Sequence, residues 1–209
     1  MIREDIKEFI QTIPSGVTVV CATKYGDSND IKTLYEAGLK DFGENRVDAF
    51  LTKYEELKNL DDIRWHFIGH LQRNKAKLII NKIDCLHSLD SLDLARKINE
   101  LRDTPLDTFI EVSINLEENK NGVPFYGLEE FINNIKDYPK IHLVGLMMMA
   151  YKDSSNPYEE FLKLKNLRDE IEAKLNISLP YLSMGMSDDY LSAIKAGSTH
   201  IRLGRILFK

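Results

Sequence analysis

The feature that most constrains the fold is a regular alternation of short strand-like and longer helix-like segments along all 209 residues. The first strand, VTVVCAT at 17–23, is uninterrupted and β-branched, as expected of a strand covered on both faces. Further strands are predicted at 39–42, 63–67, 83–87, 107–114, 141–146, 180–183 and 199–203. Helical patterns lie between them near 28–37, 45–59, 71–80, 91–102, 127–136, 157–175 and 188–196, and a helix over about 2–12 precedes the first strand.

Repeated strand–helix units with short connections imply a parallel sheet, and eight of them fit a closed (β/α)₈ TIM barrel. The alternative is a doubly wound open sheet, but no GxGxxG motif follows the first strand, so its usual nucleotide signature is missing. No low-complexity linker or shift in composition divides the sequence. We therefore expect a single α/β domain over 1–209, a barrel with an extra N-terminal helix.

The composition narrows the classes of partner. The net charge of −5 argues against a broad electrostatic grip on nucleic acid or on an anionic membrane, although it leaves room for a local basic pocket. The longest apolar run, Val144–Tyr151, is far too short to span a bilayer, and the N-terminal segment does not have the pattern of a signal peptide. Cys21 and Cys85 lie in apolar runs without metal-ligand spacing, so we expect two buried thiols in a reducing cytoplasm. We also expect a monomer.

Active sites of such barrels collect at the C-terminal ends of the strands. Lys24 directly follows the first strand, where desolvation would make its amine more available for imine formation, unless it is merely a solvated lysine at a strand end. In DFGENRV at 41–47, Gly43 permits a tight turn. Asn45 could offer its amide to a ligand oxygen or only cap the next helix.

The segment WHFIGHLQRNK at 65–75 contains two histidines four residues apart, a spacing that suits a metal pair on a helix. The strand-like WHFI and the following glycine instead place His66 on a strand and His70 at its end. We therefore read His70, Gln72 and Asn74 as polar groups of a loop that follows this strand.

The last two loops carry features of an anion site. Ser187 can cap the helix near 188–196, and phosphate sites in barrels commonly form after the seventh and eighth strands. Gly204 lets backbone amides approach an anion closely. Asp188 and Asp189 would repel a phosphate unless their side chains turn outward.

Together these segments resemble a known family. ATK at 22–24, FGEN at 42–45, WHFIGHLQRNK, GLM at 145–147, LSMGMSDD at 182–189 and GSTHIRLG at 197–204 are similar, in order and spacing, to the signature segments of the pyridoxal phosphate homeostasis proteins. That family resembles the N-terminal barrel of alanine racemase.

The resemblance implies pyridoxal 5′-phosphate (PLP) as the cofactor and a role for each matching residue. Lys24 matches the lysine of the Schiff base, Asn45 the residue near the phenolic oxygen, and Arg202 the arginine that faces the pyridine nitrogen. Ser187 and the backbone of Gly204 and Arg205 match the phosphate site, and His66 and Met184 match positions that line the pocket. The sequence departs from the family pattern at Tyr25-Gly26 and at the C-terminal RILFK, which leaves the first loop and the packing of the last turn open.

We predict a carrier of PLP rather than an enzyme, with no catalytic residue. A guanidinium opposite the ring nitrogen weakens the cofactor as an electron sink. The racemases also need a second base from another domain, for which 209 residues leave no room. Tyr25 is the nearest phenol, but it should point away from Lys24 if the strand continues. The expected role is buffering PLP and delivering it to apo-enzymes. A weak racemase and a cofactor-free, lysine-dependent aldolase remain as alternatives.

Overall fold

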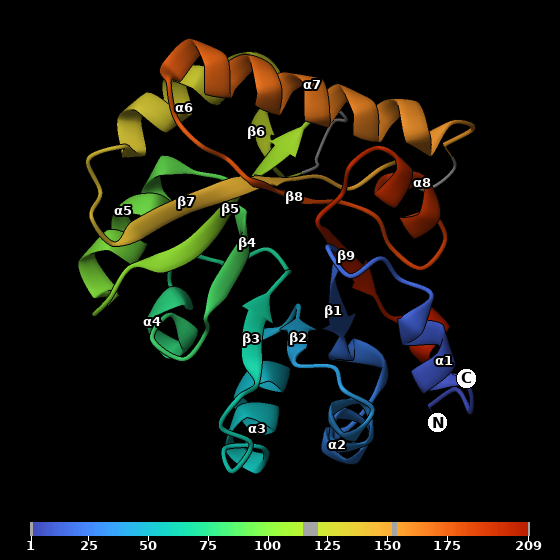
Figure 1. Ribbon diagram of the computed structural model, residues 1–209. Coiled ribbons are helices and arrows are strands. Elements are labelled where there is room, and N and C mark those ends of the chain that lie inside the picture. The colour runs from blue at the N-terminus through green and yellow to red at the C-terminus, as the bar shows by residue number, and fades with distance from the viewer. Residues whose placement is uncertain (1, 115–120, 152–153, 209) are drawn as a thin grey trace.

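The computed structural model describes residues 2–114, 121–151 and 154–208. Its strands run β4-β3-β2-β1-β9-β8-β7-β5, all parallel, and pairing of β4 with β5 closes them into a barrel (Figure 1). The barrel strands are β1 (Thr18–Ala22), β2 (Asp41–Glu44), β3 (Arg64–Phe67), β4 (Cys85–Leu89), β5 (Leu106–Ser113), β7 (Ile141–Met147), β8 (Tyr181–Ser183) and β9 (His200–Leu203). The predicted (β/α)₈ barrel is confirmed, with one addition: a two-residue strand, β6 (Val123–Pro124), pairs with the end of β5.

The helices are α1 (Ile6–Gln11), α2 (Ser28–Glu36), α3 (Val47–Glu56), α4 (Ala76–Ile79), α5 (Leu92–Leu101), α6 (Leu128–Ile135), α7 (Pro157–Leu175) and α8 (Tyr190–Lys195). The helix predicted at 71–80 is reduced to the single turn of α4, whose N-cap residue, Lys75, forms no side-chain capping hydrogen bond. By contrast, α2 begins at a capping box formed by Asp27 and Asp30, which satisfies backbone amides at its start.

The two ends of the described chain lie side by side (Figure 1). Ile2 pairs with Phe208 in an antiparallel bridge, and the Arg3 amide donates to the Leu207 carbonyl at 3.1 Å. Leu207 is fully buried. The packing that the sequence left open is therefore supplied by contacts between the N-terminal and C-terminal segments.

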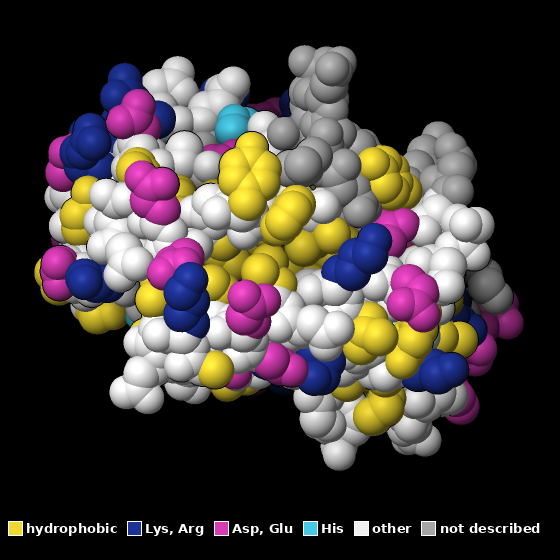
Figure 2. All heavy atoms as spheres, turned by 90° about the horizontal axis from the view of Figure 1, so that it is seen from above, with side chains coloured by type: hydrophobic (Ala, Val, Ile, Leu, Met, Phe, Trp, Pro, Cys, Tyr) yellow, Lys and Arg dark blue, Asp and Glu magenta, His cyan; other side chains and the backbone are white. Residues whose placement is uncertain are grey.

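Charge on the visible face of the molecule in Figure 2 is mixed. On the face shown in Figure 2, lysine and arginine side chains are interspersed with aspartate and glutamate, without a large area of one sign. Within the described ranges, no helix combines the length and the apolar character that crossing a bilayer requires.

The barrel interior departs from the usual filling of branched aliphatic side chains. Its buried residues include His66, His87, Ser183, His200 and Arg202. Cys21 and Cys85 are buried free thiols, as predicted. Burial raises the pKa of the Cys85 thiol well above its usual value, so this side chain is held as a neutral thiol.

Candidate functional site

A pocket of about 550 Å³ opens at the C-terminal ends of the barrel strands. It brings together six of the residues singled out from the sequence, which are Lys24, Asn45, Ser187, Arg202, Gly204 and Arg205. They come from the loops after β1, β2 and β8 and from β9 and the turn that follows it. Residues up to 181 positions apart in the chain therefore meet because parallel strands end at one face.

Lys24 lies in a short 3₁₀ turn, Thr23–Tyr25, that begins where β1 ends. Its side chain is exposed rather than buried, and its Nζ lies 5.0 Å from the centre of the Tyr25 ring. The expectation that Tyr25 points away from Lys24 was conditional on the strand continuing. Since the strand ends at Ala22, side chains no longer alternate and the two residues lie together.

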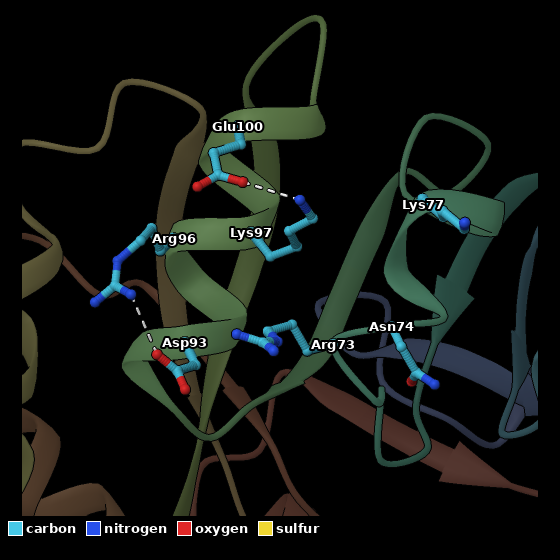
Figure 3. A pocket seen from close by; sticks show the side chains of 7 residues that line it. All are labelled: Arg73, Asn74, Lys77, Asp93, Arg96, Lys97 and Glu100. Carbon is cyan, nitrogen blue, oxygen red and sulfur yellow. Dashed lines mark hydrogen bonds and ion pairs between the residues drawn. The ribbon is translucent and has the colours of Figure 1, made fainter.

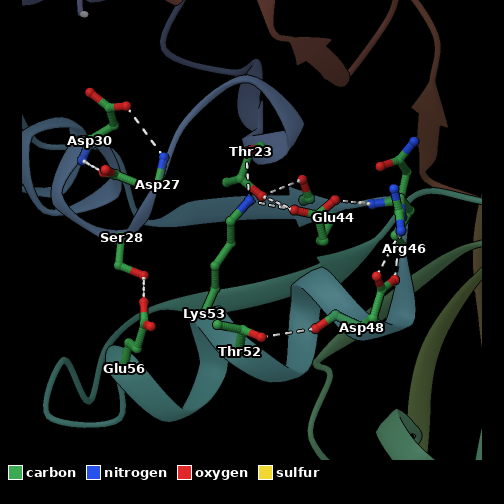
Figure 4. A network of polar contacts seen from close by, with 12 residues as sticks. Thr23, Asp27, Ser28, Asp30, Glu44, Arg46, Asp48, Thr52, Lys53 and Glu56 are labelled. Atoms are coloured by element: carbon green, nitrogen blue, oxygen red, sulfur yellow. Dashed lines mark hydrogen bonds and ion pairs between the residues drawn. The ribbon is translucent and has the colours of Figure 1, made fainter.

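A buried ion pair supports this turn from below (Figure 4). Lys53 Nζ, from α3, donates to the Glu44 carboxylate and to the Thr23 carbonyl, both at 2.7 Å. Glu44 also accepts from the Thr23 hydroxyl at 2.9 Å and from the Asn45 amide at 2.8 Å. One buried carboxylate thus ties the turn that carries Lys24 to the backbone of Asn45.

Asn45 has an unsatisfied side chain. It does not cap α3, because the N-cap position is Arg46. Its Oδ1 is buried and has no hydrogen-bond partner in the part of the chain that the structure describes. Gly69 packs directly against it, since a Cβ at this glycine would lie 2.2 Å from the Asn45 carbonyl oxygen. A buried polar atom without a partner is costly, and Asn45 is one of the residues that line the pocket.

Arg202 forms the floor of the pocket as a buried cation. Its Nη1 donates to the carbonyl and to the hydroxyl of Ser183, at 2.9 and 2.7 Å, and its Nη2 donates to the Met148 carbonyl at 2.9 Å. Burial lowers the pKa of Arg202 to about 10, while Glu111 and Asp189 oppose this shift. The side chain is therefore charged at neutral pH and held in one orientation.

The anion end of the pocket differs from the predicted helix cap. The helix α8 begins at Tyr190, so Ser187 lies too early to cap it. The Ser187 hydroxyl instead accepts from the amides of Gly204 and Ile206, at 3.2 and 3.4 Å. Asp188 turns to Arg205 and forms an ion pair with it. Because this ion pair offsets the negative charge of Asp188, that side chain repels a phosphate less than the sequence suggested.

Two predicted residues are not among those that line the pocket. His66 and Met184 are both fully buried. His66 lies deeper in the barrel, where its ring nitrogens contact Asp41 and His87. His70 does line the pocket and contacts Asp90 at 2.9 Å, so the two histidines of this segment have separate surroundings. Another group, formed by His66, Cys85 and His87, was not identified from the sequence. Their potential metal-ligand atoms lie within 4.8 Å of one another.

The sequence reading also missed Glu111, which lines the pocket from β5. Burial raises the pKa of Glu111 from 4.5 to about 6, and repulsion from Asp90 adds to this, whereas Arg202 lowers it. The one signal was an acidic residue within the otherwise apolar run FIEV, at the C-terminal half of a predicted strand.

The raised pKa makes the stability contribution of Glu111 dependent on pH. The contribution is fully present below 4.5, the usual pKa, and is lost as the pH rises through about 6. For Glu111→Gln, we expect the free energy of unfolding relative to the parent protein to rise by about 2 kcal/mol between about pH 4 and about pH 7.5. Urea unfolding at both pH values measures the difference, and a constant difference would contradict the prediction.

A second hollow, of about 490 Å³, lies between α4 and α5 (Figure 3). Two of its four cations pair with carboxylates on the same helix, Arg96 with Asp93 at 3.3 Å and Lys97 with Glu100 at 3.0 Å. Asn74, one of the polar loop residues of the sequence analysis, lies here and not in the first pocket. No residue of the predicted cofactor site lines this hollow.

Comparison with known proteins agrees with the geometry. The family model of the alanine racemase N-terminal domain matches residues 2–209. The pyridoxal phosphate homeostasis protein of Aquifex aeolicus is 43% identical over 185 residues, which cover 85% of this chain and 80% of that protein. The structure of PipY from Synechococcus elongatus PCC7942 with PLP bound is 29% identical, with a TM-score of 0.90 over 98% of this chain and 100% of that one.

An alanine racemase from Corynebacterium glutamicum shares the fold, with a TM-score of 0.75 and 13% identity, over 97% of this chain and 58% of the racemase. The homeostasis proteins thus match this chain over most of their own length and at higher sequence identity, whereas the racemase matches over little more than half of its length. The chain belongs to the alanine racemase N-terminal domain family and, within it, to the pyridoxal phosphate homeostasis proteins.

Proposed function

We propose that this protein binds PLP in the pocket around Lys24 and acts in PLP homeostasis, as a carrier that buffers the cofactor and delivers it. The observation that carries the proposal is the meeting of Lys24, the unpartnered Asn45 oxygen and the buried Arg202 guanidinium in one pocket. The relatives named above support it, one by its name and one by its bound ligand.

The residues present fit this cofactor. A bound PLP would supply an aldehyde that reacts with amines and an aromatic ring that withdraws electrons. Lys24 would hold it covalently, with its amine joined to the aldehyde carbon and water released. Asn45, whose buried side-chain oxygen has no partner among the described residues, would bind a polar atom of the ring, and Arg202 would face the ring nitrogen. The Ser187 hydroxyl and the amides at Gly204 and Arg205 would hold the phosphate.

The exposed rim of the pocket favours release of a bound cofactor over its enclosure. Tyr25, Met149 and Met186 line it with 45%, 48% and 37% of their surface exposed. Enzymes generally enclose a reactive cofactor against water and side reactions. We therefore assign transfer of PLP to an apo-enzyme as the function. We further propose that the protein acts as a monomer in the cytoplasm, where the two free thiols would stay reduced.

The experiment has two arms. Borohydride reduction of the PLP-loaded protein and peptide mass mapping should place the pyridoxyl group on Lys24, and an adduct mainly on Lys75 would overturn the assignment. The loaded protein should also transfer PLP to an excess of an apo-enzyme and show no racemase, transaminase or decarboxylase turnover on a panel of amino acids. Steady turnover without transfer would reject the carrier function.

Replacing Ser187 by alanine tests the phosphate site. The change removes a hydroxyl that both binds an anion and orients the Gly204 amide. We expect PLP affinity to fall by about ten- to a hundredfold, the usual range for a hydrogen bond to a charged group. The absorption maximum of bound PLP should not move, because Lys24 is untouched. Ser178→Ala, on the far side of the barrel in a separate hollow, is the matched control. Unchanged affinity in Ser187→Ala would restrict Ser187 to a structural role.

A minimal PLP-dependent enzyme, such as a weak racemase, is the second candidate. Two observations favour it, the raised pKa of Glu111 within the pocket and the position of the Tyr25 phenol beside Lys24. These groups could exchange a proton with a bound amino acid. Racemase turnover that is lost in Glu111→Gln would support this candidate. A protein that acquires no visible absorption band with PLP would instead favour a cofactor-free, lysine-dependent reaction.

A further inference from the structure

A chain of hydrogen bonds crosses the barrel interior from Arg202 to the opposite end of the strands. Arg202 Nη1 lies 2.7 Å from Ser183 Oγ, and Ser183 Oγ lies 2.8 Å from His87 Nδ1. His87 Nε2 lies 2.8 Å from His66 Nδ1, and His66 Nε2 lies 2.9 Å from Asp41 Oδ1. The five residues come from β9, β8, β4, β3 and β2, so this series of hydrogen bonds connects both halves of the barrel.

The two ends of this chain fix the direction of every hydrogen bond. A guanidinium only donates, and an ionised carboxylate only accepts. Arg202 therefore donates to the Ser183 oxygen, so the Ser183 hydroxyl is free to donate to His87 Nδ1. His87 then carries its proton on Nε2 and donates to His66 Nδ1. His66 likewise carries its proton on Nε2 and donates to Asp41.

The reverse direction fails at both ends. If a singly protonated His66 donated through Nδ1, its unprotonated Nε2 would face the Asp41 carboxylate, with two acceptors opposed at 2.9 Å. Ser183 Oγ would then receive protons from both His87 and Arg202. Its own hydroxyl proton would have no acceptor among its contacts in the described chain.

The surroundings keep the His87 imidazole uncharged. His66, His87 and Ser183 have no exposed surface, and Phe109 stacks on the His87 ring with centroids 4.5 Å apart. Burial lowers the pKa of His87 well below its usual value and lowers that of the neighbouring His200 to about 3. A neutral His87, with one ring proton to donate, is what the directed series of hydrogen bonds requires.

We propose that Asp41, His66, His87 and Ser183 are positioning residues, forming a directed relay that orients the Arg202 guanidinium and stabilises its charge from the far end of the barrel. Aligned dipoles present the Ser183 oxygen to Arg202, and the carboxylate that terminates them lies at the partly exposed start of β2. The relay explains why the barrel interior holds histidines. Its bearing on PLP rests on the function proposed above, whereas its existence does not.

The relay is tested first in the cofactor-free protein by ¹⁵N NMR of the histidine side chains. We expect His66 and His87 both as neutral Nε2–H tautomers, with a scalar coupling across the hydrogen bond from His87 Nε2 to His66 Nδ1. A Nδ1–H tautomer at either ring would overturn the relay. Absence of this coupling, together with added Zn²⁺ retained after dialysis, would also overturn it and assign His66, Cys85 and His87 to a metal site.

The second test compares Asp41→Asn with Asp107→Asn. Asp107 is a similar control, because its carboxylate also lies near the start of a barrel strand. It contacts Arg64 and His142 but no member of the relay. In Asp41→Asn we expect the NMR signals of His66, His87 and the Arg202 guanidinium to move together. In Asp107→Asn the His66 and His87 tautomers and the Arg202 signals should stay in place. Equal movement of the Arg202 signals in both variants would reduce the effect to general electrostatics and reject the proposal.

The third test measures PLP affinity. Ser183→Ala removes the hydroxyl next to Arg202 and should weaken PLP binding by about tenfold, and Asp41→Asn by about threefold, as expected for hydrogen bonds of ordinary net strength. Unchanged affinity in Ser183→Ala would reject a positioning role toward the cofactor. If the parent protein itself bound no PLP, the proposed function would fail, while the NMR tests would still decide whether the relay exists.

Discussion

Replacing Lys24 by alanine is expected to abolish covalent capture of PLP and the visible absorption band that accompanies it. Lys24 is the lysine among the described residues that line the pocket, and its Nζ lies beside the Tyr25 ring at the pocket rim. No other amine in that set can react with the aldehyde. Residual binding through the phosphate site should be weak and should disappear on gel filtration. Absorption spectra before and after desalting provide the measurement.

The controls separate chemistry from charge. Lys24→Arg keeps a cation but cannot form the linkage, so it should behave as Lys24→Ala does. Lys75→Ala removes an exposed lysine at the start of α4, outside the pocket, and should bind PLP as the parent protein does. A stable band in Lys24→Ala, with a reduced adduct on another lysine, would refute the assignment.

Replacing Lys53 by methionine is expected to have the largest effect on stability. The Glu44 carboxylate is fully buried and Lys53 is 12% exposed, so the change leaves a buried charge without its counter-ion. Loss of one partner of such a pair typically costs about 3–5 kcal/mol. The turn that carries Lys24 should also loosen, because the Thr23 carbonyl loses the Lys53 amine as a donor and keeps only the Gly26 amide. Urea unfolding measures the stability.

A double variant identifies the cause. Lys53→Met combined with Glu44→Gln removes both charges and should recover a large part of the lost stability, since a neutral amide is far cheaper to bury. Lys58→Met, which breaks the exposed pair of Lys58 and Glu55, should cost less than about 1 kcal/mol. Equal losses in Lys53→Met and Lys58→Met would show that burial does not decide the strength of the first pair.

The sequence by itself determined the barrel and most of the pocket. The alternation of strand and helix patterns predicts parallel strands, and parallel strands end at one face whatever their exact register. That rule was enough to gather Lys24, Asn45, Ser187 and Gly204 at one pocket, because each follows a strand, whereas Arg202 was assigned only through the family resemblance. It did not require knowledge of any side-chain contact.

The tertiary structure alone decided which polar side chains reach the pocket and which stay inside the barrel. A period of two separates the faces of a strand, but it does not give the depth of a side chain along the barrel axis. The resemblance placed His66 and Met184 in the pocket, although both are buried and neither lines it, and Glu111 was overlooked.

Contacts between strands that are far apart in the sequence could not be predicted from it either. His87 and Ser183 are 96 residues apart, and Lys53 reaches Thr23 across 30. Such pairs depend on strand register and on where β1 gives way to a turn, which local patterns fix only to within a few residues. A shift of one residue exchanges the inner and outer faces of a strand. The barrel was thus predictable from periodicity, whereas the buried relay depends on register, which only the folded barrel sets.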